Sequence, residues 1–394
     1  MKDNKTNTNK SKSLMRFFSL FMTLFSICIL VITSCRDDAY VYLSESKQVA
    51  PRRINSKIRG FYLLNEGNMG MNRATIDFFS YDTGEYFTDT YSEKNPEVVK
   101  ELGDVGNDIE IYGSKCYAVI NCSNYVEVFD AQSGIHIASI DIPNCRYIKF
   151  HDGKAYVSSY SGPVGLSPNA EHGFVAEIDT TSLTLTRKVI VGYQPEEMVI
   201  KENKLYVANS GGYRVPNYDR TVSVVDIPSF EIIKTIDVGI NLHRMEIDKR
   251  GDIYVSSRGD YYDVSPNLYV IDSDSDEVKQ KLDIPVSELC MMGDSLYYYS
   301  TAYSFTTGTN EVTYGILDTR DKQIVSHKII KDGTDKDIMM PYGLSVNPET
   351  KEIYITDAQN YVVTGYLYCY SSDGILKWKT PAGNIPAHIA YLYK

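Results

Sequence analysis

One phrase of alternating apolar and polar residues recurs along this chain and limits what it can fold into. It is clearest in Lys204-Leu205-Tyr206-Val207-Ala208-Asn209, and a tyrosine stands at its centre in seven copies, at positions 62, 117, 156, 206, 254, 297 and 354. Alternation with β-branched and aromatic residues predicts half-buried strands. The steps between these tyrosines are 55, 39, 50, 48, 43 and 57 residues. Such a period, with several strands in each unit, is typical of a β-propeller.

Each unit is predicted to hold four strands, A to D, with short A–B and C–D turns and longer B–C connections. In the second unit the strands are expected at 108–111, 115–120, 125–130 and 135–140. The first unit supplies only B, C and D, at 60–64, 74–80 and 85–90, and its strand A is expected at 388–393. We therefore predict an all-β fold over residues 57–394. It is a seven-bladed β-propeller with four-stranded blades, closed by the C-terminal strand joining blade one, which leaves no open sheet edge.

The N-terminus reads as a lipoprotein signal over residues 1–34, with five basic residues ahead of and beside an apolar run from Phe17 to about Ile32. Ile32-Thr33-Ser34 before Cys35 resembles the bacterial lipobox, in which that cysteine is lipidated. The following Arg36-Asp37-Asp38 is similar to the surface-export signal of Bacteroidota lipoproteins. Ordinary signal-peptide cleavage and an uncleaved anchor are the alternatives. Residues 35–56 are expected to form the lipidated N-terminus and a flexible tether.

Net charge argues against nucleic acid as a partner, and cysteine spacing argues against a cysteine metal site. The formal net charge is −11 and the body carries no basic run, which argues against nucleic acid as a partner. Five cysteines remain after Cys28 and Cys35, and their spacing matches no metal site. Cys122 and Cys145 lie near strand ends in adjacent units, so a disulfide between them is an open alternative to two free thiols.

Two sets of polar residues recur at fixed places in the units. An aspartate closes strand C at positions 130, 179, 226, 272 and 318, which we interpret as turn chemistry. A polar residue follows strand B in nearly every unit and begins a long loop. Such loops are expected from 159 to 173, 209 to 220, 257 to 267, 300 to 311 and 357 to 365. In a propeller the B–C and D–A loops share one face, and rigid scaffolds carry function on such loops.

Amides and tyrosines on one wide face suit a large, polar, mostly uncharged ligand. The alternative for each amide taken singly is that it caps the backbone. Arg146 and Arg244 are equally compatible with exposed charges or salt bridges between blades. The candidate ligand-binding residues are Asn65, Asn68, Asn121, Asn124, Tyr160, Asn209, Tyr213, Arg244, Arg258, Tyr261, Tyr303, Tyr342, Asp357, Tyr361 and His388.

Enzyme signatures are missing from the sequence. The six histidines show no close metal spacing, and neither HExxH, GxSxG nor a phosphate loop occurs. We predict a protein that is not an enzyme and has no cofactor and no metal. A lactonase-type propeller is the less favoured alternative, and His243 and His388 would then be the residues to test.

The repeated Lys-Leu-Tyr-Val-Ala-Asn phrase, followed by a strand ending Val224-Val225-Asp226, resembles the YncE/YVTN-like propellers over residues 59–394. A narrower likeness covers Phe61 to Gly70, Asn95-Pro96, Glu101 to Asp108 and Tyr117 to Asn124, which look like the BtuG-type surface lipoproteins of Bacteroides. That resemblance implies a seven-bladed propeller that captures cobalamin and related corrinoids. It also implies an outer-membrane, cell-surface protein that hands this ligand to a TonB-dependent transporter. A protein- or glycan-binding propeller is the alternative.

Overall fold

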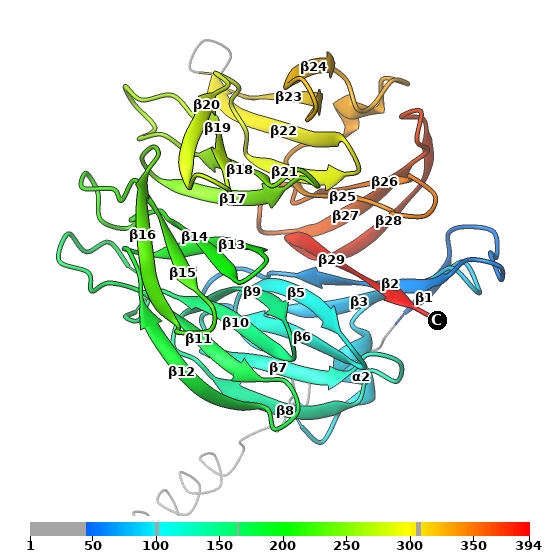
Figure 1. The fold of residues 1–394 in the computed structure, drawn as a ribbon. Coiled ribbons are helices and arrows are strands. Elements are labelled where there is room, and N and C mark those ends of the chain that lie inside the picture. The colour runs from blue at the N-terminus through cyan, green and yellow to red at the C-terminus, as the bar shows by residue number, and fades with distance from the viewer. Residues whose placement is uncertain (1–44, 99–101, 164, 305–308) are drawn as a thin grey trace, which may run out of the picture. The chain divides into compact units, whose positions relative to one another are not determined.

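The computed structural model describes residues 45–98, 102–163, 165–304 and 309–394, and there the chain forms seven antiparallel sheets. The sheets follow one another around a ring, with each inner strand packed against the inner strands of its two neighbours (Figure 1). The predicted seven-bladed β-propeller is therefore confirmed. In the described ranges no helix has the length and apolar character needed to cross a membrane.

The blades share one strand order, A-B-C-D, from the inside outward. The A strands are β29 (Pro386–Tyr393), β5 (Gly106–Tyr112), β9 (Cys145–His151), β13 (Pro195–Lys201), β17 (Leu242–Ile247), β21 (Glu288–Met292) and β25 (Pro341–Val346). The B strands are β2 (Ile58–Asn65), β6 (Lys115–Ile120), β10 (Lys154–Ser159), β14 (Lys204–Asn209), β18 (Asp252–Ser257), β22 (Ser295–Ser304) and β26 (Ile353–Asp357).

The C strands are β3 (Thr75–Ser80), β7 (Tyr125–Asp130), β11 (Phe174–Asp179), β15 (Thr221–Asp226), β19 (Asn267–Asp272), β23 (Thr309–Asp318) and β27 (Thr364–Tyr370). The D strands are β4 (Glu85–Phe87), β8 (His136–Asp141), β12 (Thr184–Ile190), β16 (Glu231–Asp237), β20 (Glu277–Lys281), β24 (Gln323–Ser326) and β28 (Leu376–Asn384). The helix α2 (Thr90–Lys94) lies in the D–A connection between blades one and two, and the 3-10 turn η1 (Thr334–Asp337) lies in the one between blades six and seven.

The ring closes where the two ends of the propeller meet. The C-terminal β29 pairs antiparallel with β2, as the sequence predicted. In this pairing Tyr62 lies opposite Ala390 and Leu64 lies opposite His388. Blade one has a fifth strand that was not predicted, because β1 (Ser46–Gln48) pairs with the outer strand β4. The expected flexible tether over residues 35–56 is thus part of the folded domain from Ser46 onward. Arg53 supports this assignment through its ion pair with Glu352 of blade seven.

Blade six departs from the predicted loop pattern. Residues 300–311 were expected to form an irregular B–C loop, but β22 and β23 continue as a ladder to the pair Ser304 and Thr309. The run Ser300-Thr301-Ala302-Tyr303 keeps the strand alternation, and Thr and Tyr favour strands. This connection is therefore an extended hairpin.

The repeated tyrosines fill the space between blades. Six of the seven are at most 2% exposed, and Tyr297 is half-buried. Several also donate a hydrogen bond to the C–D turn of the next blade. The Tyr62 hydroxyl lies 3.0 Å from the Ala131 carbonyl, and the Tyr206 hydroxyl lies 3.1 Å from the Ser273 carbonyl. At Tyr62 and Tyr206 these contacts join burial of a large ring to a satisfied hydroxyl. Burial between blades makes the repeated tyrosines packing residues.

The aspartates at the ends of the C strands are turn residues, as predicted. Asp130 Oδ1 accepts the Ser133 backbone N–H at 2.8 Å, and Asp179 Oδ1 accepts that of Ser182 at 2.8 Å. The five cysteines of the described region are free thiols, Cys122 and Cys145 among them. The alternative of a disulfide between those two is therefore not realised in this structure.

The tyrosine contacts between blades predict a measurable difference between two Tyr→Phe variants. In Tyr206→Phe the buried Asp276 loses a hydroxyl donor, and we expect the free energy of unfolding to fall by about 1–3 kcal/mol. Tyr117→Phe is the matched control, because its buried hydroxyl has no hydrogen-bond partner among the residues that the structure describes. Denaturant unfolding measures both variants, and an equal loss in the two would contradict this assignment.

Candidate functional site

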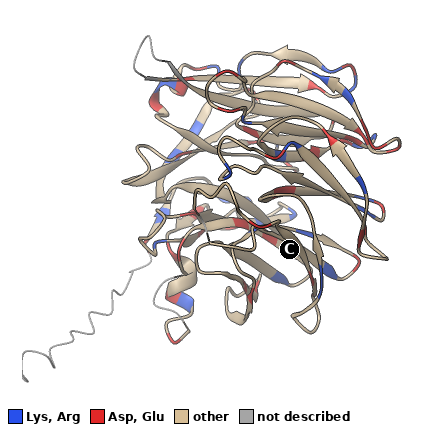
Figure 2. Ribbon diagram, turned by 90° about the vertical axis from the view of Figure 1, so that its left-hand side faces the viewer, with Lys and Arg blue, Asp and Glu red and all other residues tan. Residues whose placement is uncertain are grey.

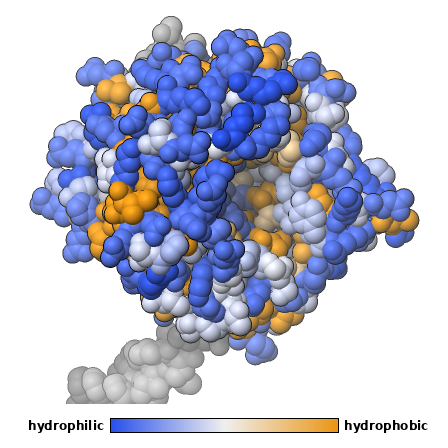
Figure 3. Space-filling view, viewed as in Figure 1, coloured by the Kyte–Doolittle hydropathy of each residue, from blue (hydrophilic) through white to orange (hydrophobic). Residues whose placement is uncertain are grey.

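The seven inner strands surround a central cavity of about 200 Å³, and all seven contribute to its lining. The molecular surface is hollowed near its centre (Figure 3). Residues at the beginning of each inner strand lie toward the B–C and D–A loops, and later residues lie deeper. The axis of the ring is therefore the place where side chains from all blades meet.

A β-bulge at the start of the inner strand recurs in several blades. In blade three, Arg146 and Tyr147 together oppose the single residue Ser158 of β10, and in blade five His243 and Arg244 oppose Ser256 of β18. A hydroxyl of strand B satisfies the backbone N–H that the bulge leaves unpaired. Ser158 Oγ accepts from the Tyr147 N–H at 3.1 Å and Ser256 Oγ from the Arg244 N–H at 2.9 Å. The bulge thus brings two consecutive polar side chains near the axis.

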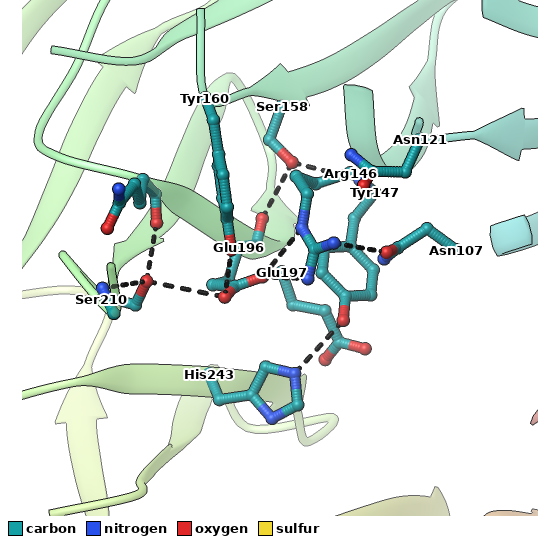
Figure 4. Close-up of polar contacts among 12 residues, drawn as sticks. Asn107, Asn121, Arg146, Tyr147, Ser158, Tyr160, Glu196, Glu197, Ser210 and His243 are labelled. Carbon is teal, nitrogen blue, oxygen red and sulfur yellow. Dashed lines mark hydrogen bonds and ion pairs between the residues drawn. The ribbon is translucent and has the colours of Figure 1, made fainter. Parts of the chain in front are cut away.

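The first polar cluster is centred on Glu196 of blade four (Figure 4). Glu196 Oε2 accepts from Arg146 Nη2 at 3.0 Å and Nε at 3.2 Å. Glu196 Oε1 accepts the Tyr160 hydroxyl at 2.5 Å and lies 3.3 Å from Arg258 Nη1. Arg146 also donates to Asn107 of blade two. This cluster, the Glu196 cluster, ties blades two to five together, and of the two possibilities for Arg146 it realises the salt bridge between blades.

A second cluster is centred on Arg244. Its Nη1 lies 2.8 Å from Glu197 Oε1 and 3.0 Å from the Tyr147 hydroxyl, and its Nη2 lies 2.7 Å from Glu288 Oε2. The Tyr147 hydroxyl also meets His243 Nε2 at 3.1 Å (Figure 4). Arg244 is 5% exposed and joins blades five, four and six. Arg244 is therefore a buried bridge between blades, and it offers little free surface to a ligand.

The histidines and one carboxyl near the axis are shifted toward their neutral forms. Burial, followed by the charges of Arg258, Arg244 and Arg146, lowers the pKa of His243 well below its usual value. Burial and Arg244 lower the pKa of His388 in the same way. Burial raises the pKa of Glu66 to about 7, against the Tyr342 hydroxyl that it accepts at 2.7 Å. The 3.9 Å approach of His388 to Glu66 is thus no ion pair, because the imidazole is neutral.

Deeper in the cavity, acidic side chains outnumber basic ones. Burial raises the pKa of both Asp108 and Glu246 to about 7. Lys149 pairs with Glu110, and its charge opposes the shift at Asp108. Within the described ranges, no group of three or more His, Cys, Asp or Glu side chains is arranged to hold a metal ion.

Four of the predicted ligand-binding residues are buried at the ends of B strands. Asn65, Asn121, Asn209 and Asp357 are each at most 2% exposed. Their side chains hold neighbouring loops: Asn209 Oδ1 accepts the Gly192 N–H at 3.1 Å, and Asp357 Oδ1 accepts the Met340 N–H at 2.9 Å. A ligand would have to break these bonds to reach them. We therefore assign them the structural role of capping, which the sequence had left as the alternative.

The remaining predicted residues divide by depth. Tyr160 is 6% exposed and belongs to the wall of the Glu196 cluster, beside the Tyr213 ring at 6.1 Å. Arg258, Tyr342 and His388 are half-buried near the axis. Tyr261 and Tyr361 are exposed on loops, and the Asn68 amide donates to the Tyr361 carbonyl. Asn124 is exposed and bonds the Asn144 N–H, whereas the side chain of Tyr303 lies outside the described residues.

The loops of this face also expose apolar side chains. The other large exposed apolar residues of the blades lie mainly on outer strands and C–D turns, such as Ile137 and Ile233. Those on B–C and D–A loops are Met69, Met71, Val98, Leu166, Val215, Tyr261, Tyr262, Val264, Met339, Tyr361, Val362 and Val363. Acidic and basic residues are interspersed along the strands and turns (Figure 2). The face therefore combines charged and polar side chains near the axis with exposed apolar and aromatic side chains on the surrounding loops.

The sequence of residues 59–380 matches a family described as a domain of unknown function, DUF5074. The chain belongs to the DUF5074 family. No curated protein matches it. As a DUF5074 protein it has a propeller scaffold, a fold that in general can serve binding or catalysis.

Similar solved structures show the same fold at low identity. A hypothetical selenium-binding protein from Sulfolobus tokodaii has a TM-score of 0.63 at 11% identity, covering 85% of this chain and 93% of that one. A quinonprotein alcohol dehydrogenase-like protein from Bacteroides thetaiotaomicron has a TM-score of 0.53 at 16% identity, covering 85% and 78%. The computationally designed Ika8 protein has a TM-score of 0.53 at 10% identity, covering 88% and 94%. These likenesses support the architecture alone.

Sequence reasoning missed the acidic half of the site, namely Glu66, Asp108, Glu196, Glu197, Glu246 and Glu288. The sequence did contain a signal for them. These acidic residues stand at or near the ends of predicted inner and B strands, where a packed ring would be expected to have apolar residues. What was not visible is the bulge that turns Glu196 and Glu197 together toward the axis.

The buried carboxyl groups predict a pH dependence of stability. The folded pKa of Glu246 lies above its unfolded value of about 4.5, so the folded state binds more protons between these values and stability falls as pH rises from about 4.5 to 7. Glu246→Gln has no carboxyl group at this position to lose a proton, so this decrease in stability is removed. Between pH 4.5 and pH 8, we expect the free energy of unfolding of the wild type to fall by on the order of 1–3 kcal/mol more than that of the variant. Chemical denaturation across that range measures it. The exposed Glu277→Gln is the control, and identical profiles for wild type and Glu246→Gln would refute the assignment.

Proposed function

We propose that this DUF5074 protein is a cell-surface lipoprotein that binds a corrinoid on its B–C/D–A face and delivers it to a TonB-dependent outer-membrane transporter. Binding uses no covalent chemistry and no cofactor of the protein's own. The likeness of residues 61–70 and 117–124 to BtuG-type lipoproteins points to this ligand. The proposal goes beyond the family match, which carries no ligand.

The observation that carries the proposal is the composition of the B–C/D–A face. Its centre holds the arginine, tyrosine and glutamate side chains of the Glu196 cluster, and its rim holds exposed tyrosines such as Tyr261 and Tyr361. A corrin ring presents a broad apolar plane edged by amide groups. Tyrosine rings give rigid contact area to such a plane, and polar groups bind the amides.

Calorimetry with cyanocobalamin tests the ligand. We expect wild-type protein to bind, and the double variant Tyr261→Ala/Tyr361→Ala to bind at least tenfold more weakly because two exposed rings are removed. Tyr393→Ala is the control, since Tyr393 is 54% exposed at the end of β29, away from the loops of this face. The absence of any binding heat with wild-type protein would refute the corrinoid proposal.

The apolar rim supports the second part of the proposal, a protein partner in the outer membrane. Met69, Met71, Val362 and Val363 are each more than 40% exposed on the B–C loops of blades one and seven. Asn384 Nδ2 donates to the Val362 carbonyl at 2.6 Å, so the loop that carries the valines is fixed to blade seven. Fixed, exposed apolar groups suit the core of a protein interface.

Co-purification from native outer membranes tests the partner and the anchor together. We expect a TonB-dependent transporter to co-purify with wild-type protein and to be lost from Met69→Asp/Val362→Asp, because two charges would be placed in the interface. Ile137→Asp, on the outer strand β8, is the control. In the same preparation the N-terminal peptide should begin at an acylated Cys35. Recovery of the transporter with both variants alike would refute the docking surface.

A further inference from the structure

Arg258 differs from the other two arginines near the axis in its exposure. It directly follows β18 and begins the B–C loop of blade five. Its side chain is 29% exposed, compared with 14% for Arg146 and 6% for Arg244. Of these three guanidinium groups, it is the one most open to a molecule entering from the loop face.

Arg258 also has the weakest ion pair of the three. Glu196 Oε2 is occupied by two N–H groups of Arg146, at 3.0 and 3.2 Å. Glu196 Oε1, the oxygen that Arg258 reaches at 3.3 Å, already accepts the Tyr160 hydroxyl at 2.5 Å and has Ser210 Oγ at 3.4 Å. One carboxylate therefore serves two guanidinium groups, and the Glu196 cluster holds one more positive than negative charge.

The other groups around Arg258 do not cancel that charge. Burial raises the pKa of the Tyr160 and Tyr147 hydroxyls, so these two groups carry no charge. The two histidines are neutral as well, and after burial the charge of Arg258 is the largest cause that keeps His243 so. Glu66, on the blade-one side, is held partly protonated by burial. Within the Glu196 cluster, guanidinium charge thus exceeds carboxylate charge.

We infer that Arg258 binds an anionic group, a phosphate or a carboxylate, of the ligand that enters through the B–C/D–A face. This rests on the proposed function and adds the chemical class of the group recognised at the centre. A planar guanidinium that is half-exposed and loosely paired can turn its free N–H groups to such an anion. The anion and the Glu196 carboxylate would then together balance the two guanidinium charges. Corrinoids with a nucleotide loop carry a phosphodiester, and cobinamide lacks it.

The test compares cyanocobalamin with dicyanocobinamide on the full-length protein. We expect Arg258→Gln to weaken cyanocobalamin binding at least tenfold and cobinamide binding less than twofold, and Arg258→Lys to recover part of the loss because it keeps the charge. Arg320→Gln, an exposed arginine of a C–D turn paired with Asp318, is the control. An equal loss for both corrinoids, or no loss for either, would overturn the inference.

A second measurement stands apart from the corrinoid proposal. Inorganic phosphate and acetate, each compared with chloride at equal ionic strength, are added during thermal unfolding. We expect phosphate, acetate or both to raise the wild-type Tm by about 1 °C or more and to have no such effect on Arg258→Gln. The two anions distinguish a phosphate from a carboxylate site. If wild type binds no corrinoid but shows this Arg258-dependent shift, the ligand proposal fails and the anion site stands. The same Tm response in wild type and variant would overturn the site.

Discussion

The propeller depends on closing a ring of sheets, none of which buries its faces alone. Each blade packs both faces against its neighbours, and the tyrosine at the centre of strand B supplies much of that contact. The pairing of β29 with β2 completes the ring by placing the last strand of the chain inside blade one. Without it, β2 would be an unpaired edge and blade seven would lose its inner neighbour. The position of every axial side chain follows from this closure.

The site depends on a smaller device, the bulge at the start of the inner strands. A regular strand would place consecutive side chains on opposite faces of the blade. The bulges let Glu196 and Glu197, or His243 and Arg244, both act near the axis. The serine and threonine hydroxyls of strand B stabilise the bulges, because they accept hydrogen bonds from the backbone N–H groups that the bulges leave unpaired. Polar chemistry at the axis is therefore built into the backbone of the blades.

Charge in the site is arranged in two layers with different character. The Glu196 cluster near the loops holds more guanidinium than carboxylate charge, and the deeper cavity holds Asp108, Glu246 and Glu288, whose carboxyl groups burial shifts toward the neutral form. Arg244 lies between them and pairs with Glu197 and Glu288. This division lets an acidic protein present a positive group on its B–C/D–A face, while burial shifts several deeper carboxyl groups toward the neutral form.

Local sequence patterns determined the fold to a large extent. The strand alternation around Tyr206, the turn aspartates such as Asp179 and the displaced strand 388–393 predicted seven blades and their closure, because these signals act within a few residues or through a fixed period. The pairing of β1 with blade one and the extended hairpin of blade six were missed, because the partner of an edge strand is chosen by tertiary contact. Tertiary structure also decided the site. It buried Asn65 and Asn209 as caps and joined Arg146, Glu196 and Arg258 from three blades, since residues separated by 50 to 112 positions meet only when the ring closes.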